Sequence, residues 1–159
     1  MKTVVYRGGV LRFCVPSSWK EKYSDWDGGV FYEDVPGSGT LRIKVITLRV
    51  PTKTKDNSAA AIMEPILRQL GKDATDVVQV GRNALVRYQQ ASIEQGKNLR
   101  IFYWVFANPV PPSDARVVTF SYTVLETEAN TTHTLDELNM LEREIVKTEF
   151  AAQIGVVSE

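Results

Sequence analysis

Three long segments of β-forming residues in the second half of the chain restrict the fold more than any other feature. They run over residues 84–93, 99–107 and 116–127. The links between them, residues 94–98 and 108–114, are short. Parallel neighbours would need a crossover of about a dozen residues or more, so links of this length predict antiparallel pairing. The sequence therefore predicts a three-strand antiparallel meander.

The middle segment of this meander shows where the sheet has its centre. Residues 101–106 read Ile-Phe-Tyr-Trp-Val-Phe, so both alternating faces of the strand are apolar. A strand that faces water on one side alternates apolar and polar residues, whereas a strand covered on both sides does not. We therefore expect a central strand with a packed layer on each face.

The first half of the chain predicts further strands. Residues 3–15 hold two short apolar runs separated by glycines, which indicate an opening hairpin that ends at Pro16. Residues 16–29 are polar with interspersed aromatics and predict a structured loop or one irregular helical turn. Residues 30–32 and 40–50 predict a pair of strands joined by a glycine-containing turn.

The first of two predicted helices contains a proline. It begins at Asp56 or Ser58, both good N-caps, and runs toward Gly71 as its C-terminal stop. Pro65 would lie in its interior, where the ring clashes with the preceding turn. We expect either a kink at this proline or two short helical pieces.

The second helix completes the predicted architecture. It begins at Thr134, where Thr-Leu-Asp-Glu predicts a capping box closed by Glu137. Together the elements predict an α+β fold. This is an α/β/α sandwich with a central, mainly antiparallel sheet of about six to seven strands and two main helices. A single domain is expected over residues 1–154, with residues 155–159 as a frayed tail.

Composition excludes several classes of protein. The 159 residues are 43% apolar, which is typical of a folded domain and not of a disordered chain. The 19 basic and 19 acidic residues cancel, so binding nucleic acid is not an expected main function. The single cysteine, Cys14, excludes an internal disulfide and suits a reducing compartment. No signal segment or membrane span is predicted, so the expected location is the cytoplasm.

The order of elements resembles a known group. The segments LRFCVPSSWKEKYSDWDGGVFYED and GTLRIKVITLRV are followed by a helix, three long strands and a terminal helix. This arrangement resembles the PsbP-like superfamily, which includes a photosystem II accessory protein, a Ran-binding protein and bacterial DcrB-like proteins. The resemblance implies an α/β/α sandwich without a common catalytic motif, in proteins that act as binding or assembly factors. The chain lacks the transit segment of the plant members, so a bacterial role is expected.

Few residues suggest catalysis or metal binding. Asp25, Asp27, Glu33 and Asp34 lie within ten positions and form the only combination suited to a hard cation. They miss the calcium-loop pattern, and acidic residues beside turn glycines are common without an ion. The sequence contains no nucleophile motif for which the only histidine, His133, could act as a general base. We therefore interpret His133 as a solvated residue before the helix cap. No catalytic residue, metal or cofactor is predicted.

The same acidic segment carries most of the aromatics that could contact a partner. Tryptophan and tyrosine on surface loops often anchor protein complexes. Core packing is the expected role of Phe31 and of Trp19. For Trp26, which lies between two aspartates, the sequence leaves open whether the side chain is exposed. The predicted partner-binding set is Trp19, Tyr23, Asp25, Trp26, Asp27, Glu33 and Asp34.

These observations favour a non-enzymatic binding or accessory protein that acts on an unidentified protein partner, as a monomer or homodimer. One alternative is a small-molecule or lipid carrier with a pocket between the sheet and the helix near Pro65. Another is an immunity or inhibitor protein, which would need an acidic or aromatic contact face. An enzyme would require Asp25, Asp27 and His133 to converge in one cleft.

Overall fold

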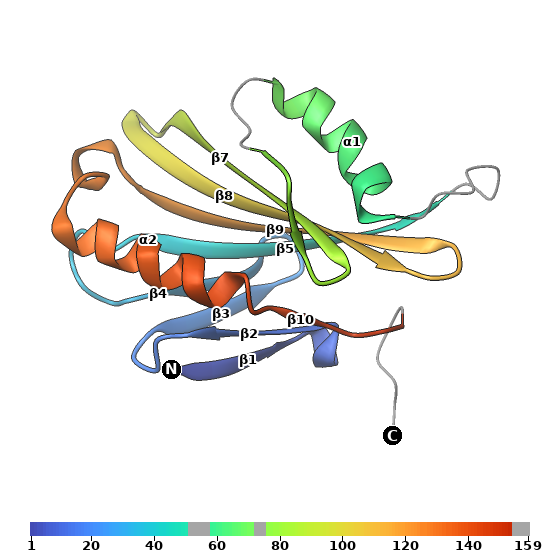
Figure 1. Ribbon diagram of the computed structural model, residues 1–159. Helices are drawn as coiled ribbons and strands as arrows, with labels where there is room; N and C mark the ends of the chain where they lie inside the picture. Colours follow the sequence, from blue (N-terminus) through green and yellow to red (C-terminus); the bar gives the residue numbers. More distant parts are fainter. Residues whose placement is uncertain (51–57, 72–75, 154–159) are drawn as a thin grey trace.

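A seven-stranded antiparallel sheet forms the centre of the protein, in the order β3-β4-β5-β9-β8-β7-β6 (Figure 1). The structure, a computed structural model, describes residues 1–50, 58–71 and 76–153, so the predicted tail at 155–159 lies outside it. The seven strands are β3 (Lys20–Ser24), β4 (Gly28–Tyr32), β5 (Thr40–Arg49), β6 (Val78–Val80), β7 (Asn83–Glu94), β8 (Lys97–Val110) and β9 (Asp114–Leu125).

One helix lies on each face of this sheet (Figure 1). Helix α1 (Ala59–Leu70) packs over β7 and β8. Helix α2 (Thr132–Ile145) covers the opposite face together with a small sheet of order β1-β2-β10. The strands of the small sheet are β1 (Lys2–Tyr6), β2 (Leu11–Val15) and β10 (Glu149–Phe150). The predicted α+β class and helix–sheet–helix layering are confirmed. None of the described helices is long and apolar enough to cross a membrane.

The predicted strand is β8, which lies inside the sheet between β9 and β7, and its two faces belong to two different apolar clusters. Trp104 and Phe106 pack into the cluster beneath α2 and the small sheet. Val105 and Ala107 pack into the cluster beneath α1. The uninterrupted apolar run in this strand therefore has the predicted cause, which is burial on both sides.

Two expectations about the ends of elements were wrong. Residues 16–29 are not a loop, because Lys20–Ser24 form β3, an edge strand with every residue exposed. A strand with no buried face leaves no alternating apolar pattern to recognise. Helix α2 begins one turn earlier than predicted, since the hydroxyl of Thr131, not Thr134, accepts a hydrogen bond from a first-turn N–H.

Helix α1 is a single helix despite its proline. Ser58 caps it by accepting a hydrogen bond from the N–H of Ala61 at 3.2 Å, and Gly71 ends it with a positive φ of 61°. Pro65 lies within the helix, and the chain does not divide there into two pieces. Burial of the helix face around Met63, which is fully buried, provides the packing that stabilises the helix across this position.

The half-buried carboxylate of Glu142 connects α2 to the sheet. Glu142 accepts a hydrogen bond at 2.9 Å from Nε of Arg87 on β7, and a second from the indole N–H of Trp104 on β8. Burial raises the pKa of the Glu142 carboxyl, but these hydrogen bonds outweigh burial and hold the pKa below its ordinary value. The ion pair therefore favours the folded state when the carboxyl is charged.

We expect Glu142→Gln to lower the free energy of unfolding at pH 7 by about 1–2 kcal/mol, since the site is partly exposed and its charge partly screened. The folded carboxyl has the lower pKa, so its contribution is complete above the ordinary value of 4.5 and is lost as the pH falls through the folded value. Urea unfolding between pH 3 and 7 should show the difference shrinking in acid, with Asp136→Asn on the exposed face of α2 as control. A difference independent of pH would contradict this account.

Candidate functional site

The β3–β4 hairpin places an exposed tryptophan at its tip. Trp26 is 93% exposed, between two exposed aspartates, Asp25 and Asp27. The turn is held by the hydroxyl of Ser24, which accepts a hydrogen bond from the N–H of Asp27 at 2.8 Å. Gly28 has a φ of 71°, and a Cβ there would lie 2.4 Å from the carbonyl oxygen of Ile43, so only glycine fits. The tip is therefore an ordered projection of the sheet.

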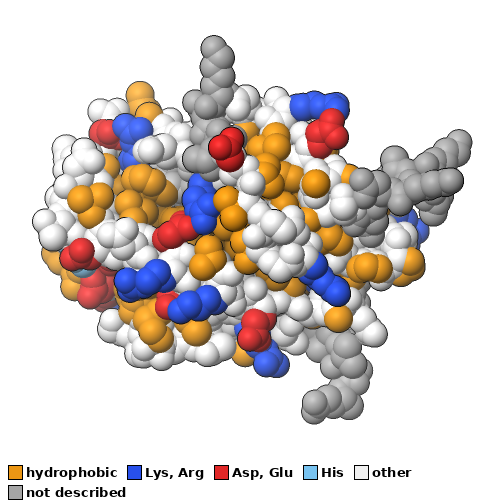
Figure 2. All heavy atoms as spheres, in the orientation of Figure 1, with side chains coloured by type: hydrophobic (Ala, Val, Ile, Leu, Met, Phe, Trp, Pro, Cys, Tyr) orange, Lys and Arg blue, Asp and Glu red, His pale blue; other side chains and the backbone are white. Residues whose placement is uncertain are grey.

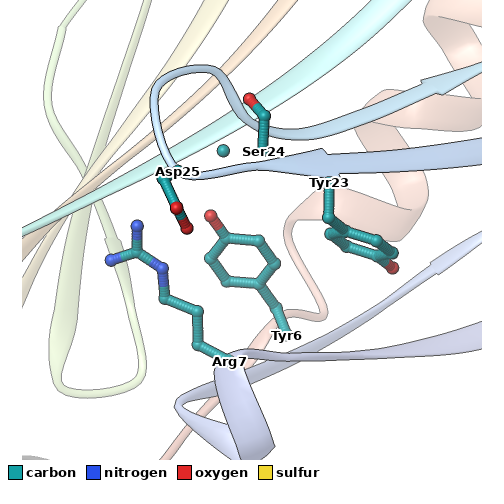
Figure 3. A pocket seen from close by; sticks show the side chains of 6 residues that line it. Tyr6, Arg7, Tyr23, Ser24 and Asp25 are labelled. Carbon is teal, nitrogen blue, oxygen red and sulfur yellow. The ribbon is translucent and has the colours of Figure 1, made fainter.

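A cavity of about 350 Å³ lies beside this tip. In Figure 3 the side chains of Arg7 and Asp25 point toward one another beside the hydroxyl of Tyr6. The guanidinium of Arg7 also lies 5.5 Å from the centre of the Tyr6 ring. Arg7 has a φ of 45°, a left-handed conformation that is unfavourable for a residue other than glycine, in the turn between β1 and β2. The lining residues are Tyr6, Arg7, Tyr23, Ser24, Asp25 and Gly28.

Tyr23 joins the cavity to the core. Its ring is 55% exposed and meets the edge of Phe31 at 5.9 Å between ring centres. Its hydroxyl donates a hydrogen bond to Glu21. Partial burial, and then this hydrogen bond, raise the pKa of the Tyr23 hydroxyl, so it remains a neutral donor. Contact with Phe31 and the hydrogen bond to Glu21 therefore hold the Tyr23 side chain in place, and about half of it remains open to solvent.

The structure divides the predicted partner-binding set into three places. Tyr23, Asp25, Trp26 and Asp27 lie together at or beside the hairpin tip. Trp19 does not join them, because it is 3% exposed and stacks over the ring of Tyr122. The predicted core roles of Trp19 and Phe31 are confirmed.

The two remaining acidic residues of that set lie beyond the other end of β4. Asp34 pairs with Lys20, whose hydrogen bond holds the pKa of that carboxyl below its ordinary value. Glu33 lies beside His133, with 3.5 Å between its Oε2 and the histidine Nε2. Strand β4 separates these residues from the tip, so closeness in sequence did not bring them into one surface.

His133 is not an isolated residue before a cap. It lies inside the first turn of α2, and its Nε2 is 3.3 Å from Oε1 of Glu137. Glu137 was predicted to close a capping box, but it is buried and accepts a hydrogen bond from the hydroxyl of Tyr122. Burial raises the pKa of the Glu137 carboxyl. Asp25 and Asp27 lie at the opposite end of β4, so the grouping considered for an enzyme does not form.

A spacing signal for this contact is present in the sequence. Residues four apart on a helix share one face, and His133 and Glu137 have that spacing. Finding it required the helix to begin at Thr132 instead of after Thr134. Glu33 lies close to both of these residues, but no spacing in the sequence indicates it, because only the folded sheet brings Glu33 to α2.

The interface near Pro65 is packed by apolar side chains. Met63 is fully buried and Ile62 nearly so, against the small residues Ala84 and Ala107. A groove of about 320 Å³ instead lies between α2 and strands β7 and β8, on the other face of the sheet. Phe102, Trp104 and Leu138 are among its lining residues. In this region hydrophobic side chains reach the surface among charged ones (Figure 2).

Comparison with known proteins shows the fold alone. No protein-family model matches the chain, and no curated protein matches its sequence. A solved structure from Bacteroides thetaiotaomicron matches with a TM-score of 0.65 at 17% identity, over 94% of this chain and 48% of that one. This chain thus spans about half the length of the Bacteroides protein.

A second solved structure has a similar fold. It is LpqN of Mycobacterium tuberculosis, described as involved in cell envelope biogenesis. The match has a TM-score of 0.60 at 15% identity and covers 89% of this chain and 83% of LpqN. Both neighbours are bacterial proteins with a similar fold, and the resemblance to the PsbP-like superfamily stays a prediction.

Proposed function

We propose that this chain is a non-enzymatic binding protein that docks onto a protein partner through the tip of the β3–β4 hairpin, with Trp26 as the anchor. The observation that carries the proposal is the 93% exposure of Trp26 on an ordered turn. An aromatic side chain of this size buries about 150–250 Å² in a complex, at roughly 25 cal/mol per Å². Seating Trp26 in a partner would thus contribute roughly 4–6 kcal/mol before the losses of association.

The groups around Trp26 indicate what the partner presents. Asp25 and Asp27 flank the indole, so a basic rim around an apolar pocket would complement the tip. In the adjacent cavity, Arg7 supplies N–H donors and Asp25 supplies acceptor oxygens. A peptide group of the partner offers the matching carbonyl and N–H. We therefore expect the tip to bind an exposed, basic segment of a protein.

Two similarities support an accessory role without naming the partner. LpqN, which has a similar fold, is described as involved in cell envelope biogenesis. The order of elements also resembles the PsbP-like superfamily, whose better known members are binding or assembly factors. The description of LpqN is compatible with an accessory role, and the acidic, aromatic tip is the feature that such a protein would use.

The direct test is to replace the anchor. The partner is captured from a lysate with the intact chain, identified and purified, and its affinity is measured by calorimetry for the intact chain and for Trp26→Ala. We expect the Kd to rise at least about 30-fold, the loss that a central interface residue produces. Because Trp26 contributes little to the core, circular dichroism and the melting temperature should not change.

The matched control is Ile93→Ala. Ile93 is 74% exposed beside the turn between β7 and β8, so the change removes a similar exposed hydrophobic side chain from another hairpin. It should leave the Kd unchanged. Equal affinities for Trp26→Ala and the intact chain, or equal losses for both variants, would exclude the tip as the docking surface.

The alternatives lead to different outcomes of the same work. If the captured partner is an enzyme that loses activity in the complex, the protein is an inhibitor of the immunity type, for which an acidic or aromatic contact face was predicted. If native mass spectrometry shows a bound small molecule that Phe102→Ala releases and Trp26→Ala does not, the carrier hypothesis replaces the docking proposal. In that case the ligand site is the groove beneath α2.

A further inference from the structure

Two carboxylates and the only histidine meet where the end of β4 approaches the start of α2. Glu33 directly follows β4, while His133 and Glu137 lie in the first turns of α2. One ligand atom from each residue lies within 4.8 Å of the other two. We propose that Glu33, His133 and Glu137 form a binding site for a divalent first-row transition metal ion such as Zn²⁺. This site is independent of the hairpin tip.

The separations between the ligand atoms fit such an ion. Nε2 of His133 lies 3.3 Å from Oε1 of Glu137 and 3.5 Å from Oε2 of Glu33. In a tetrahedral zinc site with ligands about 2.0–2.1 Å from the metal, neighbouring ligand atoms are about 3.3–3.4 Å apart. An imidazole nitrogen with carboxylate oxygens is also a donor set that suits zinc and its neighbours.

The surroundings of Glu137 orient its carboxylate toward this point. The hydroxyl of the fully buried Tyr122 donates a hydrogen bond to Oε2, which leaves Oε1 directed at His133. Hydrogen bonds of this kind position the ligands of protein metal sites and strengthen metal binding. The buried tyrosine, on β9, thus acts as an outer-shell partner of the site.

Charge balance gives an independent reason for a cation here. The side chain of Glu137 is only 9% exposed, and Glu33 lies in the same cluster. Within the described parts of the chain, no lysine or arginine forms an ion pair with Glu137, and the close neighbour of its Oε1 is the imidazole Nε2 of His133 at 3.3 Å. Burying a charged carboxylate beside a second one is unfavourable, and a bound cation stabilises the charged form of both. A divalent cation supplies that positive charge.

The proposed site leaves room for a further ligand. Three protein ligands leave one position of a tetrahedral metal open, as in zinc sites that bind water or another molecule. The side chains of His133 and Glu33 are 53% and 31% exposed, so this position faces solvent. Access of the ion from solution requires no opening of the core.

The experiment uses Zn²⁺ in calorimetry and Co²⁺ as a spectroscopic probe. The intact chain should bind one Zn²⁺, and its Co²⁺ complex should show the visible absorption of a low-coordinate cobalt site. His133→Asn and Glu33→Gln, both at partly exposed positions, should weaken Zn²⁺ binding by at least about tenfold and remove the absorption. Tyr122→Phe keeps all three ligands and should also weaken binding about tenfold.

Matched controls keep the result specific. Asp136→Asn removes an exposed carboxylate from the same helix and should not change Zn²⁺ affinity. Trp26→Ala should also bind Zn²⁺ normally, because the tip lies at the other end of β4, so failure of one proposal is distinguishable from failure of the other. Zn²⁺ binding that is absent, or that His133→Asn and Glu33→Gln leave unchanged while circular dichroism shows folded protein, would overturn the site.

Discussion

Replacing Gly39 by alanine should lower the free energy of unfolding by about 3 kcal/mol, the upper end of what an added methyl group does in a packed interior. A Cβ at this position would lie 2.2 Å from Cζ and 2.3 Å from the hydroxyl oxygen of Tyr122. Tyr122 cannot move aside easily, since it is fully buried, stacked against Trp19 and hydrogen-bonded to Glu137. The loss corresponds to a fall of roughly 6–12 °C in the melting temperature.

Thermal and urea unfolding of Gly39→Ala beside Gly96→Ala would check this result. Gly96 has a φ of 74° but no atom within 4 Å of an added Cβ, so only backbone strain of about 1 kcal/mol is expected there. Equal losses in the two variants would show that the ring of Tyr122 yields. Because Tyr122 orients Glu137, Gly39→Ala should also weaken Zn²⁺ binding in the fraction that remains folded.

Replacing Arg116 by alanine should have a comparable or larger effect, a loss of about 3–5 kcal/mol from the unsatisfied acceptors and the cavity left behind. Arg116 is 1% exposed on β9 and donates from Nη1 to Oδ1 of Asn108 at 2.9 Å. It also donates to the backbone carbonyls of Ala151, at 2.7 Å, and Gln153. Alanine would leave these acceptors unsatisfied and open a cavity.

Urea denaturation and hydrogen exchange would measure this effect. The segment after β10 should lose amide protection first, because two of its carbonyls depend on Arg116. Arg143→Ala, on the exposed face of α2, should change the free energy of unfolding by less than about 0.5 kcal/mol. If Arg116→Ala resembled that control, the buried hydrogen bonds would not be a main source of stability.

The centre of the fold was predictable because several signals agreed there. The apolar run at residues 101–106 and the short links around it required an interior strand buried on both faces, and β8 is that strand. Strand β3 was missed, because an edge strand with every residue exposed has no buried face and therefore no alternation of apolar and polar residues. The two-residue β10 was missed as well, because pairing with β2 alone defines it.

The candidate sites were predictable only where they are local in sequence. Asp25, Trp26 and Asp27 are neighbours in the chain and remain neighbours at the tip, and the structure settles the exposure of Trp26 that the sequence left open. Glu33 and His133 are a hundred positions apart, and their contact follows from the packing of α2 against the end of β4. Tertiary packing of this kind leaves no mark on periodicity or composition.

The hairpin tip has a consequence for how such proteins diversify. The exposed tip residues, Asp25–Asp27, belong to neither apolar cluster, while the glycine that follows them fixes the turn against β5. If the tip is the docking surface proposed above, substitutions there would change what the protein recognises and leave the folding free energy nearly unchanged. Under that proposal, selection for a new partner would require no compensating changes in the core.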